Sequence, residues 1–379
     1  MSSVVTCLMS KVITVIIVNY FSSVDLVKTL DSLKDNDCYA QLEIVVIDNS
    51  CDESESLILQ QLSKEKGFLL HLSEQNSGFG RACNQIYSET QTPYVLLINP
   101  DAFLLNRALD KLLLPLQDNH HIAATGPKIY WSEQQDFILP RSISFSPLSF
   151  FLNHYQHSFI KRFLWFYSLL FRKKSIQHWQ ARRPLQQKNL SGGSVLLRRS
   201  AVEKVGGLFD PVFYMYFEDS DLFKRLIEQE EQLLYIPEAE IVHQFSGCAR
   251  DQQAEKNDYM AKSSELFFNK HYPDNNLIAW GKLSSAQPFK SLWHPEIIEL
   301  GHLKSAGEVV ILLPETAHYL IEWSPSENFL PAAGLFFDGD RFHFPEDIWD
   351  ILPSGHHYLR IAPATNFWVK AKIWHWVID

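Results

Sequence analysis

The sequence has few cysteines, no excess of basic residues and no long uninterrupted apolar run, and each absence excludes a class of protein. Its five cysteines (7, 38, 51, 83 and 248) are odd in number, scattered and without CxxC spacing. This distribution argues against a disulfide framework or a cysteine-based zinc site, and it is typical of reduced thiols in a cytosol. The 44 acidic residues outnumber the 34 basic ones, which argues against a nucleic-acid partner.

The apolar stretches are too short or too interrupted for a membrane span. Residues 145–171 are broken by polar side chains, among them Asn153, His157 and Lys161, whereas a spanning helix needs about 20 mostly apolar residues. The run after Lys11 is short and predicts a buried strand rather than a signal peptide. We therefore expect a cytoplasmic protein, at most peripheral on the inner face of the cytoplasmic membrane.

The first part of the chain alternates strand and helix patterns. Apolar runs at 12–19, 42–48, 69–72 and 94–99 predict strands, and a helical pattern follows each of the first three. This alternation indicates an α/β fold: a Rossmann-like, mostly parallel sheet with helices on both faces. A GxGxxG fingerprint after the first strand and a P-loop are both missing from the sequence, which disfavours a dinucleotide dehydrogenase.

Two further regions differ in character from this α/β domain, which we place at 1–275. An insertion at about 141–185 is rich in aromatic and basic residues, and across 145–183 it predicts either contact with an anionic membrane surface or packing on the domain. After a polar linker at 276–290, residues 291–379 show a period of two, which predicts a small all-β, sandwich-like domain without helices. Asp338-Gly339 predicts a hairpin turn there, and the domain could mediate homo-oligomerisation, docking or glycan binding.

Polar side chains gather where the predicted strands end. They are Asn19, Asp48, Asp52, Asn99 and Asp101. Ligands of such sheets bind beyond the carboxyl ends of the strands. The simpler alternatives are that Asp48 caps the next helix and that Asp101 is an ordinary turn residue after Pro100.

A second acidic group follows an aromatic run at 213–217. Glu218, Asp219 and Asp221 stand at the start of a helical pattern. Carboxylates beside an apolar wall suit proton abstraction, because a low dielectric keeps a carboxylate basic. Helix capping fits the same residues, so this stretch alone does not choose between the two.

Seven motifs in order resemble the inverting family-two glycosyltransferases of the A-type fold, and most closely their rhamnosyltransferase-like branch. They are VIIVNYFSS, VVIDNSCDES, NSGFGRACN, LLINPDAFL, SGGSVLLRRSAVEKVGGLFD, YMYFEDSDLFKRL and IVHQFSG. The resemblance covers about the first 270 residues. It implies transfer of one sugar, with deoxythymidine-diphosphate-rhamnose as the first candidate donor, to a lipid-linked or growing cell-surface polysaccharide. A non-catalytic scaffold that binds sugar nucleotide or glycan stays the alternative.

The resemblance also implies a role for each matching residue. Asp219 would be the general base, with Glu218 beside it, and Asp101 with His243 would hold Mn²⁺ or Mg²⁺. The nucleotide sugar would be bound by Asn19, Asp48, Asp52, Asn76, Gly78, Phe79, Asn84 and Asn99. Gly192, Gly193 and Asp221 would lie on the acceptor side. The family's DxD motif is here Asn99-Pro100-Asp101, one carboxylate short.

Overall fold

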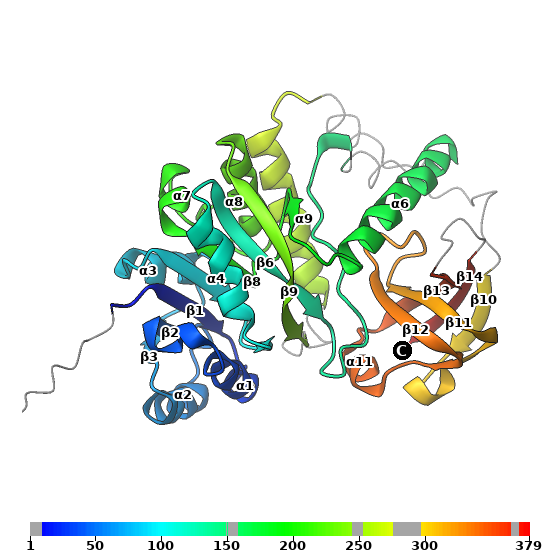
Figure 1. The fold of residues 1–379 in the computed structure, drawn as a ribbon, viewed down its shortest axis with the longest axis horizontal. Helices are drawn as coiled ribbons and strands as arrows, with labels where there is room; N and C mark the ends of the chain where they lie inside the picture. Colours follow the sequence, from blue (N-terminus) through cyan, green and yellow to red (C-terminus); the bar gives the residue numbers. More distant parts are fainter. Residues whose placement is uncertain (1–9, 149, 151–157, 245–252, 276–296, 365–370) are drawn as a thin grey trace, which may run out of the picture. The chain divides into compact units, whose positions relative to one another are not determined.

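The computed structural model describes residues 10–148, 150, 158–244, 253–275, 297–364 and 371–379 (Figure 1). The chain forms two compact units, each built from separated segments. The first comprises residues 1–128, 183–243 and 259–264, and the second comprises 129–182, 244–258 and 265–379.

The sheet of the first unit begins with four parallel strands in the order β3-β2-β1-β4. They are β1 (Ile13–Asn19), β2 (Leu42–Asp48), β3 (Leu69–Leu72) and β4 (Tyr94–Ile98). Asn19 pairs with Asp48, so β1 and β2 end at the same level. The α/β class expected from the sequence is confirmed, and the strand ends share one edge of the sheet.

Beyond β4 the sheet continues in the order β8-β6-β9-β5, and the pairs of β4 with β8 and of β9 with β5 are antiparallel. These strands are β5 (Ala102–Leu105), β6 (Ile122–Tyr130), β8 (Ser194–Arg198) and β9 (Gln232–His243), and the short β7 (Leu185–Gln187) also pairs with β9. Strand β9 runs without a break through Pro237.

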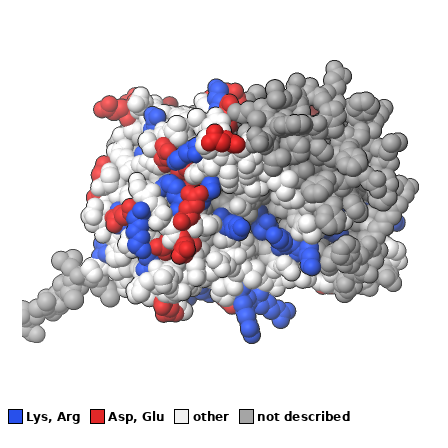
Figure 2. Space-filling view, turned by 90° about the horizontal axis from the view of Figure 1, so that it is seen from above, with Lys and Arg blue, Asp and Glu red and all other residues white. Residues whose placement is uncertain are grey.

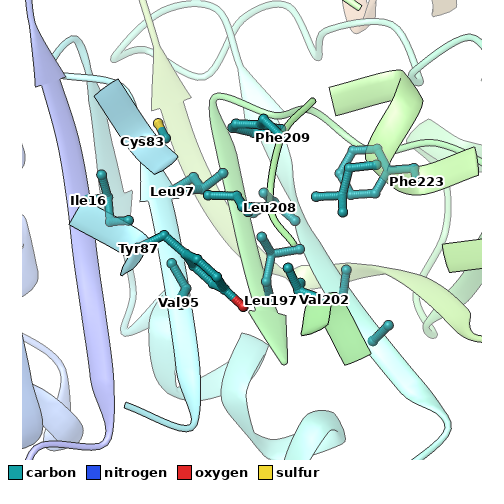
Figure 3. Packing of buried hydrophobic residues seen from close by; sticks show 14 of the residues in the cluster. Ile16, Cys83, Tyr87, Val95, Leu97, Leu197, Val202, Leu208, Phe209 and Phe223 are labelled. Carbon is teal, nitrogen blue, oxygen red and sulfur yellow. The ribbon is translucent and has the colours of Figure 1, made fainter. Parts of the chain in front are cut away.

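Helices cover the sheet because alternate strand residues point to opposite faces. On one face Ile16, Val95 and Leu97 pack into a buried cluster with the apolar sides of α3 (Phe79–Glu89), α7 (Arg199–Lys204) and α8 (Glu218–Glu228) (Figure 3). The opposite β1 residues, such as Val15 and Ile17, are equally buried. Further helices are α1 (Ser23–Leu33), α2 (Glu53–Lys66) and α4 (Ala108–Asp118).

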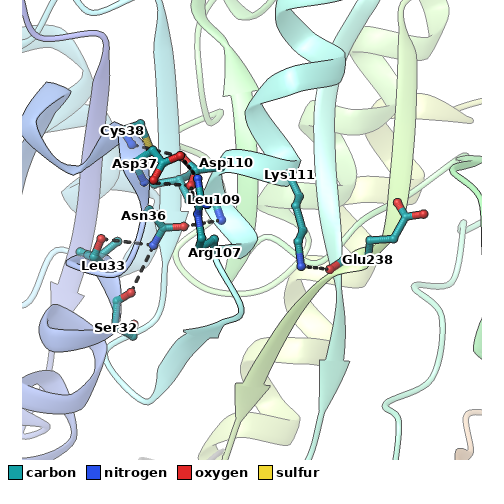
Figure 4. A network of polar contacts seen from close by, with 10 residues as sticks. All are labelled: Ser32, Leu33, Asn36, Asp37, Cys38, Arg107, Leu109, Asp110, Lys111 and Glu238. Atoms are coloured by element: carbon teal, nitrogen blue, oxygen red, sulfur yellow. Dashed lines mark hydrogen bonds and ion pairs between the residues drawn. The ribbon is translucent and has the colours of Figure 1, made fainter.

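A polar network fixes the start of α4 (Figure 4). The Asn36 Oδ1 atom accepts a hydrogen bond from the Leu109 amide at 3.0 Å, which caps the first turn of α4 in place of a local side chain. In return, Asp110 of α4 accepts from the amides of Asp37 and Cys38 at 2.9 and 3.1 Å. Those two residues begin the 3₁₀ turn Asp37–Gln41, so each element caps the other.

The second unit contains a separate five-stranded sheet in the order β10-β14-β13-β11-β12. The strands are β10 (Ile297–His302), β11 (Val310–Ser324), β12 (Ala333–His343), β13 (Gly355–Pro363) and β14 (Lys372–Ile378). The described strands form one sheet rather than two facing sheets. The predicted hairpin at Asp338-Gly339 is wrong, because both residues lie inside β12 and pair with β11, and the short helix α11 (Glu346–Ile351) was not expected.

Residues just before the aromatic insertion, together with Trp179 of the insertion, fold against this second sheet. Trp131 and Phe137 belong to the same buried cluster as Ile321 and Trp376. Ile138 exchanges backbone hydrogen bonds with Gly334 at 2.8 and 2.9 Å. A side chain at Gly334 would lie 2.5 Å from the ring of Trp179, so only glycine fits there.

A buried ionic triad ties the insertion helix α6 (Ser158–Trp179) to the sheet. Glu322 of β11 is 1% exposed and accepts from Arg172 of α6 at 2.7 Å. Arg360 of β13 donates to both oxygens of the same carboxylate, at 2.9 and 2.7 Å. Burial lowers the pKa of Arg172, against the raising effect of Glu322. Arg172 is one of the basic residues considered for membrane contact, but its guanidinium group is buried and paired with Glu322 inside the protein.

None of the described helices has a stretch that is long and apolar enough to cross a membrane. On the face shown in Figure 2, basic and acidic side chains are interspersed over the described surface. The basic pair Lys161-Arg162 falls where side chains lie outside the described part of the structure, so its predicted role stays a prediction. The last helix of the first 275 residues is α9 (Gln253–His271), of which residues 259–264 belong to the first unit.

Candidate active site

The carboxyl ends of β1 and β2 hold the first group of polar residues. Asn19 is fully buried and donates from Nδ2 to Asp48 Oδ1 at 3.1 Å. Asp48, 1% exposed, also accepts from the Ser50 amide at 3.1 Å and from the hydroxyl groups of Ser50 and Ser56. Asp48 therefore does not cap α2. It is a carboxyl group held in a fixed orientation at the ligand edge of the sheet.

Asp52 is the residue that caps α2. Its Oδ1 atom accepts from the Glu55 amide at 2.9 Å, the usual bond of an N-cap aspartate. A nucleotide contact by Asp52 stays a prediction from the resemblance.

Glu55 is a buried residue of this site that the sequence reading did not identify. Its carboxylate accepts from Asn19 Nδ2 at 2.9 Å and from both the amide and the hydroxyl of Ser23 at 3.0 Å. Glu55 thus caps the first turn of α1, where no local side chain does so. An acid in the first turn of a helix is common, so nothing in the pattern pointed to this contact across helices.

The second group lies where β4 and β9 meet. His243 ends β9 and pairs with Ala102, and its Nε2 atom lies 3.2 Å from Asp101 Oδ1 and 3.3 Å from Asn99 Nδ2. A carboxylate, an imidazole and an amide therefore converge in a partly buried place. The described residues contain no cluster of three or more His, Cys, Asp or Glu side chains suited to a metal. Two such ligands fit Mg²⁺ or Mn²⁺ in sites where substrate phosphates and water complete the shell.

Two glycines connect this group to the acidic turn of α8. Gly193 accepts from the Asn99 amide at 2.9 Å, and a Cβ atom at 193 would lie 2.8 Å from the Asn99 side chain. The Gly192 amide donates to Asp219 Oδ2 at 3.1 Å, and a Cβ atom at 192 would lie 2.6 Å from Asp219 Cβ. Only glycine fits at either position, because the Asp219 side chain lies against Gly192 and the Asn99 side chain lies against Gly193. Contacts therefore run without a break from Asp101 to Asp219.

The acids of the α8 turn lie in an apolar setting. Burial, and secondly the charge of Asp219, raise the pKa of Glu218 to about 8. Burial also raises the pKa of Asp219, while hydrogen bonds from Gly192 and Ser220 oppose the rise. Glu218 is 8% exposed, and its Oε2 atom has no hydrogen-bond partner among the described residues. Asp219 is the acid with hydrogen-bond donors that stabilise its anion, and Glu218 is the acid whose pKa is raised to about 8.

Glu218 predicts a pH dependence of stability. Its pKa in the folded protein lies above the unfolded value near 4.5, so between these two pKa values the folded state binds one proton more than the unfolded state. The stability associated with this proton is lost as the pH rises through about 8. We expect the melting temperature of Glu218→Gln, relative to the wild type, to increase between about pH 5 and pH 9, since each pH unit changes the free energy by at most about 1.4 kcal/mol. Calorimetry of both proteins checks this. Glu228→Gln, on the exposed end of the same helix, should give a flat difference, and a flat difference for Glu218→Gln would contradict the prediction.

The start of α3 borders the same turn. Gly78 has φ +80°, and a Cβ atom there would lie 2.3 Å from the carbonyl oxygen of Tyr214. Its own carbonyl accepts from Asn49 at 3.2 Å, and its amide donates to Asn76 at 3.0 Å. The glycine therefore joins the loop after β2 to the segment that precedes Glu218.

The remaining predicted residues have contacts within the protein. Asn84 exchanges hydrogen bonds with the backbone of Phe209 at 2.7 and 2.9 Å, and the ring of Phe79 lies 6.0 Å from that of Phe209. Asp221 is fully buried and binds Arg225 at 2.8 Å. Their proposed roles toward sugar nucleotide and acceptor stay predictions.

The family model of glycosyl transferase family 2 matches residues 14–206 of the chain, just over half of its 379 residues. The chain belongs to this family, and it is a glycosyltransferase. The match ends before Asp219 and His243, so the arrangement of these two residues comes from the structure alone.

Known proteins resemble the chain over limited regions. Two curated relatives from strains CDC 1551 and H37Rv of Mycobacterium tuberculosis, both N-acetylglucosaminyl-diphospho-decaprenol L-rhamnosyltransferases, are 48% identical over 54 residues. That match spans 14% of this chain and 17% of the relatives.

Three solved structures resemble larger parts of the chain at low identity. GalNAc-T7 with UDP, GalNAc and Mn²⁺ has a TM-score of 0.45 at 16% identity, over 62% of this chain and 44% of its own. The mannosyltransferase PcManGT from Pyrobaculum calidifontis, in complex with GDP-Man and Mn²⁺, has a TM-score of 0.45 at 14% sequence identity. The match covers 72% of this chain and 69% of PcManGT. S. aureus TarS 1-349 has a TM-score of 0.41 at 15% sequence identity, and the match covers 69% of this chain and 73% of TarS 1-349.

Proposed function

We propose that the protein is an inverting glycosyltransferase that moves one sugar from a nucleotide-diphosphate donor to an acceptor hydroxyl group. The observation that supports this proposal is the unbroken line of contacts from Asp101 through His243, Asn99, Gly193 and Gly192 to Asp219. The proposed metal ligands stand at one end of this line and the proposed base at the other, and such a transfer needs these two groups on either side of the sugar.

Asp219 is the general base of the proposed reaction. It takes the proton from the acceptor hydroxyl, whose oxygen bonds to the anomeric carbon as the bond to the diphosphate oxygen breaks. One displacement inverts the anomeric centre, so a single carboxylate suffices, whereas retaining hydrolases use a pair around a covalent intermediate. The raised pKa of Asp219 supports this role, because a base works best when its pKa approaches the working pH.

Asp101 and His243 hold the donor end. A bound Mn²⁺ or Mg²⁺ would neutralise charge on the diphosphate leaving group. His243 Nε2 faces Asp101 directly, so the carboxylate orients the imidazole and Asn99 restricts the space beside it. Asn19 and Asp48 lie at the adjoining strand ends, where the nucleoside of the donor would bind.

The relatives suggest the substrates. Their name specifies transfer of L-rhamnose to N-acetylglucosaminyl-diphospho-decaprenol. We take deoxythymidine-diphosphate-rhamnose as the donor and a lipid-linked glycan as the acceptor, in the building of a cell-surface polysaccharide. A lipid-linked acceptor would bring the enzyme to the inner face of the cytoplasmic membrane.

Removal of the acidic metal ligand tests the donor end. We expect Asp101→Asn to raise the Mn²⁺ concentration for half-saturation by about 10- to 100-fold, because a neutral amide binds a divalent cation less well than a carboxylate does. Electron paramagnetic resonance of Mn²⁺, titrated with protein in the presence of deoxythymidine diphosphate, measures binding independently of turnover. The exposed Asp35→Asn is the matched control. Equal Mn²⁺ binding by both variants would remove Asp101 from the site.

A further inference from the structure

The segment that delivers Asp219 is strained. Tyr216 and Phe217 both have a left-handed backbone, with φ of 69° and 66°, immediately before the first residue of α8. Neither is glycine, and the side chain of an L-residue makes this region of the backbone unfavourable. Two in succession persist only when surrounding contacts hold them. The contacts that do so therefore determine where Asp219 stands.

One such contact comes from α9, far along the chain. The buried Ser263 donates from Oγ to the carbonyl oxygen of Met215 at 2.7 Å. Met215 directly precedes the two strained residues. One turn earlier on α9, the ring of Tyr259 lies 5.1 Å from the ring of Tyr214.

The opposite side of the segment is closed by α3. The Tyr214 carbonyl lies so near Gly78 that no side chain fits between them. After the strained pair, the Asp221 amide donates to the Phe217 carbonyl at 2.9 Å and starts the helix. The segment is thus held from α3, from α9 and by its own helix, and Ser263 supplies the side-chain hydrogen bond from α9.

We infer that Ser263 is a positioning residue for the base Asp219, acting through the carbonyl of Met215. The inference rests on the proposed role of Asp219. Without the Ser263 hydroxyl, the Met215 carbonyl loses its partner, and the Tyr216–Phe217 backbone can relax out of the left-handed region. Asp219 then leaves the place where the Gly192 amide orients it, while the donor end at Asp101 and His243 is unaffected.

Hydrogen exchange tests the holding contact without any substrate. In Ser263→Ala, amides of the segment 214–220 should exchange about 5- to 100-fold faster than in the wild type, as expected for a lost buried hydrogen bond. The neighbouring Ser264→Ala is the matched control, because Ser264 lies on the same helix and is less buried than Ser263, and its exchange should match the wild type. Ser263→Thr retains the hydroxyl and should restore protection. Unchanged exchange in Ser263→Ala overturns the inference.

Kinetics test the consequence for the base. With deoxythymidine-diphosphate-rhamnose and N-acetylglucosaminyl-diphospho-decaprenol, Ser263→Ala should lower kcat about 10- to 100-fold and leave the donor KM within about twofold. Added to Asp219→Asn, it should cause no further loss, because its effect passes through that carboxylate. An equal loss in both backgrounds, or faster exchange with unchanged kcat, would reduce Ser263 to a structural contact. Full activity of Asp219→Asn would instead refute the assignment of the base and leave the exchange result standing.

Discussion

Asp219→Asn is expected to lower kcat by about 100- to 10,000-fold, the usual contribution of a general base. Asparagine is nearly the same size and still offers an oxygen to the Gly192 amide, so the site keeps its shape. It cannot accept the proton of an acceptor hydroxyl. The measurement is release of nucleoside diphosphate at saturating donor and acceptor, and the donor KM should change little because the lost interaction belongs to the transition state.

The exposed Asp118→Asn, at the end of α4, is the control for the loss of one carboxylate and should keep full activity. More than a tenth of wild-type kcat in Asp219→Asn would exclude Asp219 as the base. If Glu218→Gln showed the large loss in its place, the roles of the two acids would be reversed.

Glu322→Ala is expected to destabilise the second unit by about 3–5 kcal/mol, because it leaves two buried guanidinium groups without their shared carboxylate. Arg172 is 4% exposed and Arg360 is 8% exposed, so water cannot readily replace the lost partner. All ten tryptophans lie in the segments of the second unit, so tryptophan fluorescence during urea unfolding reports on this unit alone.

Asp338→Ala provides the contrast on the same sheet. Asp338 also contacts a basic side chain, with its Oδ1 atom 2.9 Å from His318 Nδ1, but the Asp338 side chain is 78% exposed. Exposed pairs contribute about 0–1 kcal/mol. A loss below about 1 kcal/mol for Glu322→Ala would show that the triad is hydrated in solution. Replacing all three charged residues by apolar ones of similar volume should recover much of the stability.

The parallel half of the first sheet could be predicted because each of its strands carries its own pattern. β1, β2 and β4 are continuous apolar runs bounded by polar residues, and local composition suffices to locate them. The second sheet was predicted less well. Asp338-Gly339 has the composition of a turn, yet the 15-residue partner strand β11 pairs with both residues and keeps them in a strand. Pairing with a long neighbouring strand overrides the local preference for a turn.

The candidate site shows the same division. The strand-end acids were predictable because position along one strand places them at the edge of the sheet. Glu55 and Ser263 were not, since each acts on a backbone tens of residues away, and neither residue type is unusual in a helix. The raised pKa of Glu218 also depends on burial, which the sequence alone does not show.

The composition of the second unit limits how the N-terminal and C-terminal parts of the chain can be exchanged with those of another enzyme. Its apolar interior is shared between residues 129–182 and the strands after residue 296. A protein shortened to its first 290 residues would retain Trp131, Phe137 and Trp179 but lose the strands that cover them. Such a fragment should expose a large aromatic surface and aggregate, so a hybrid enzyme must carry both pieces of this interior from the same parent.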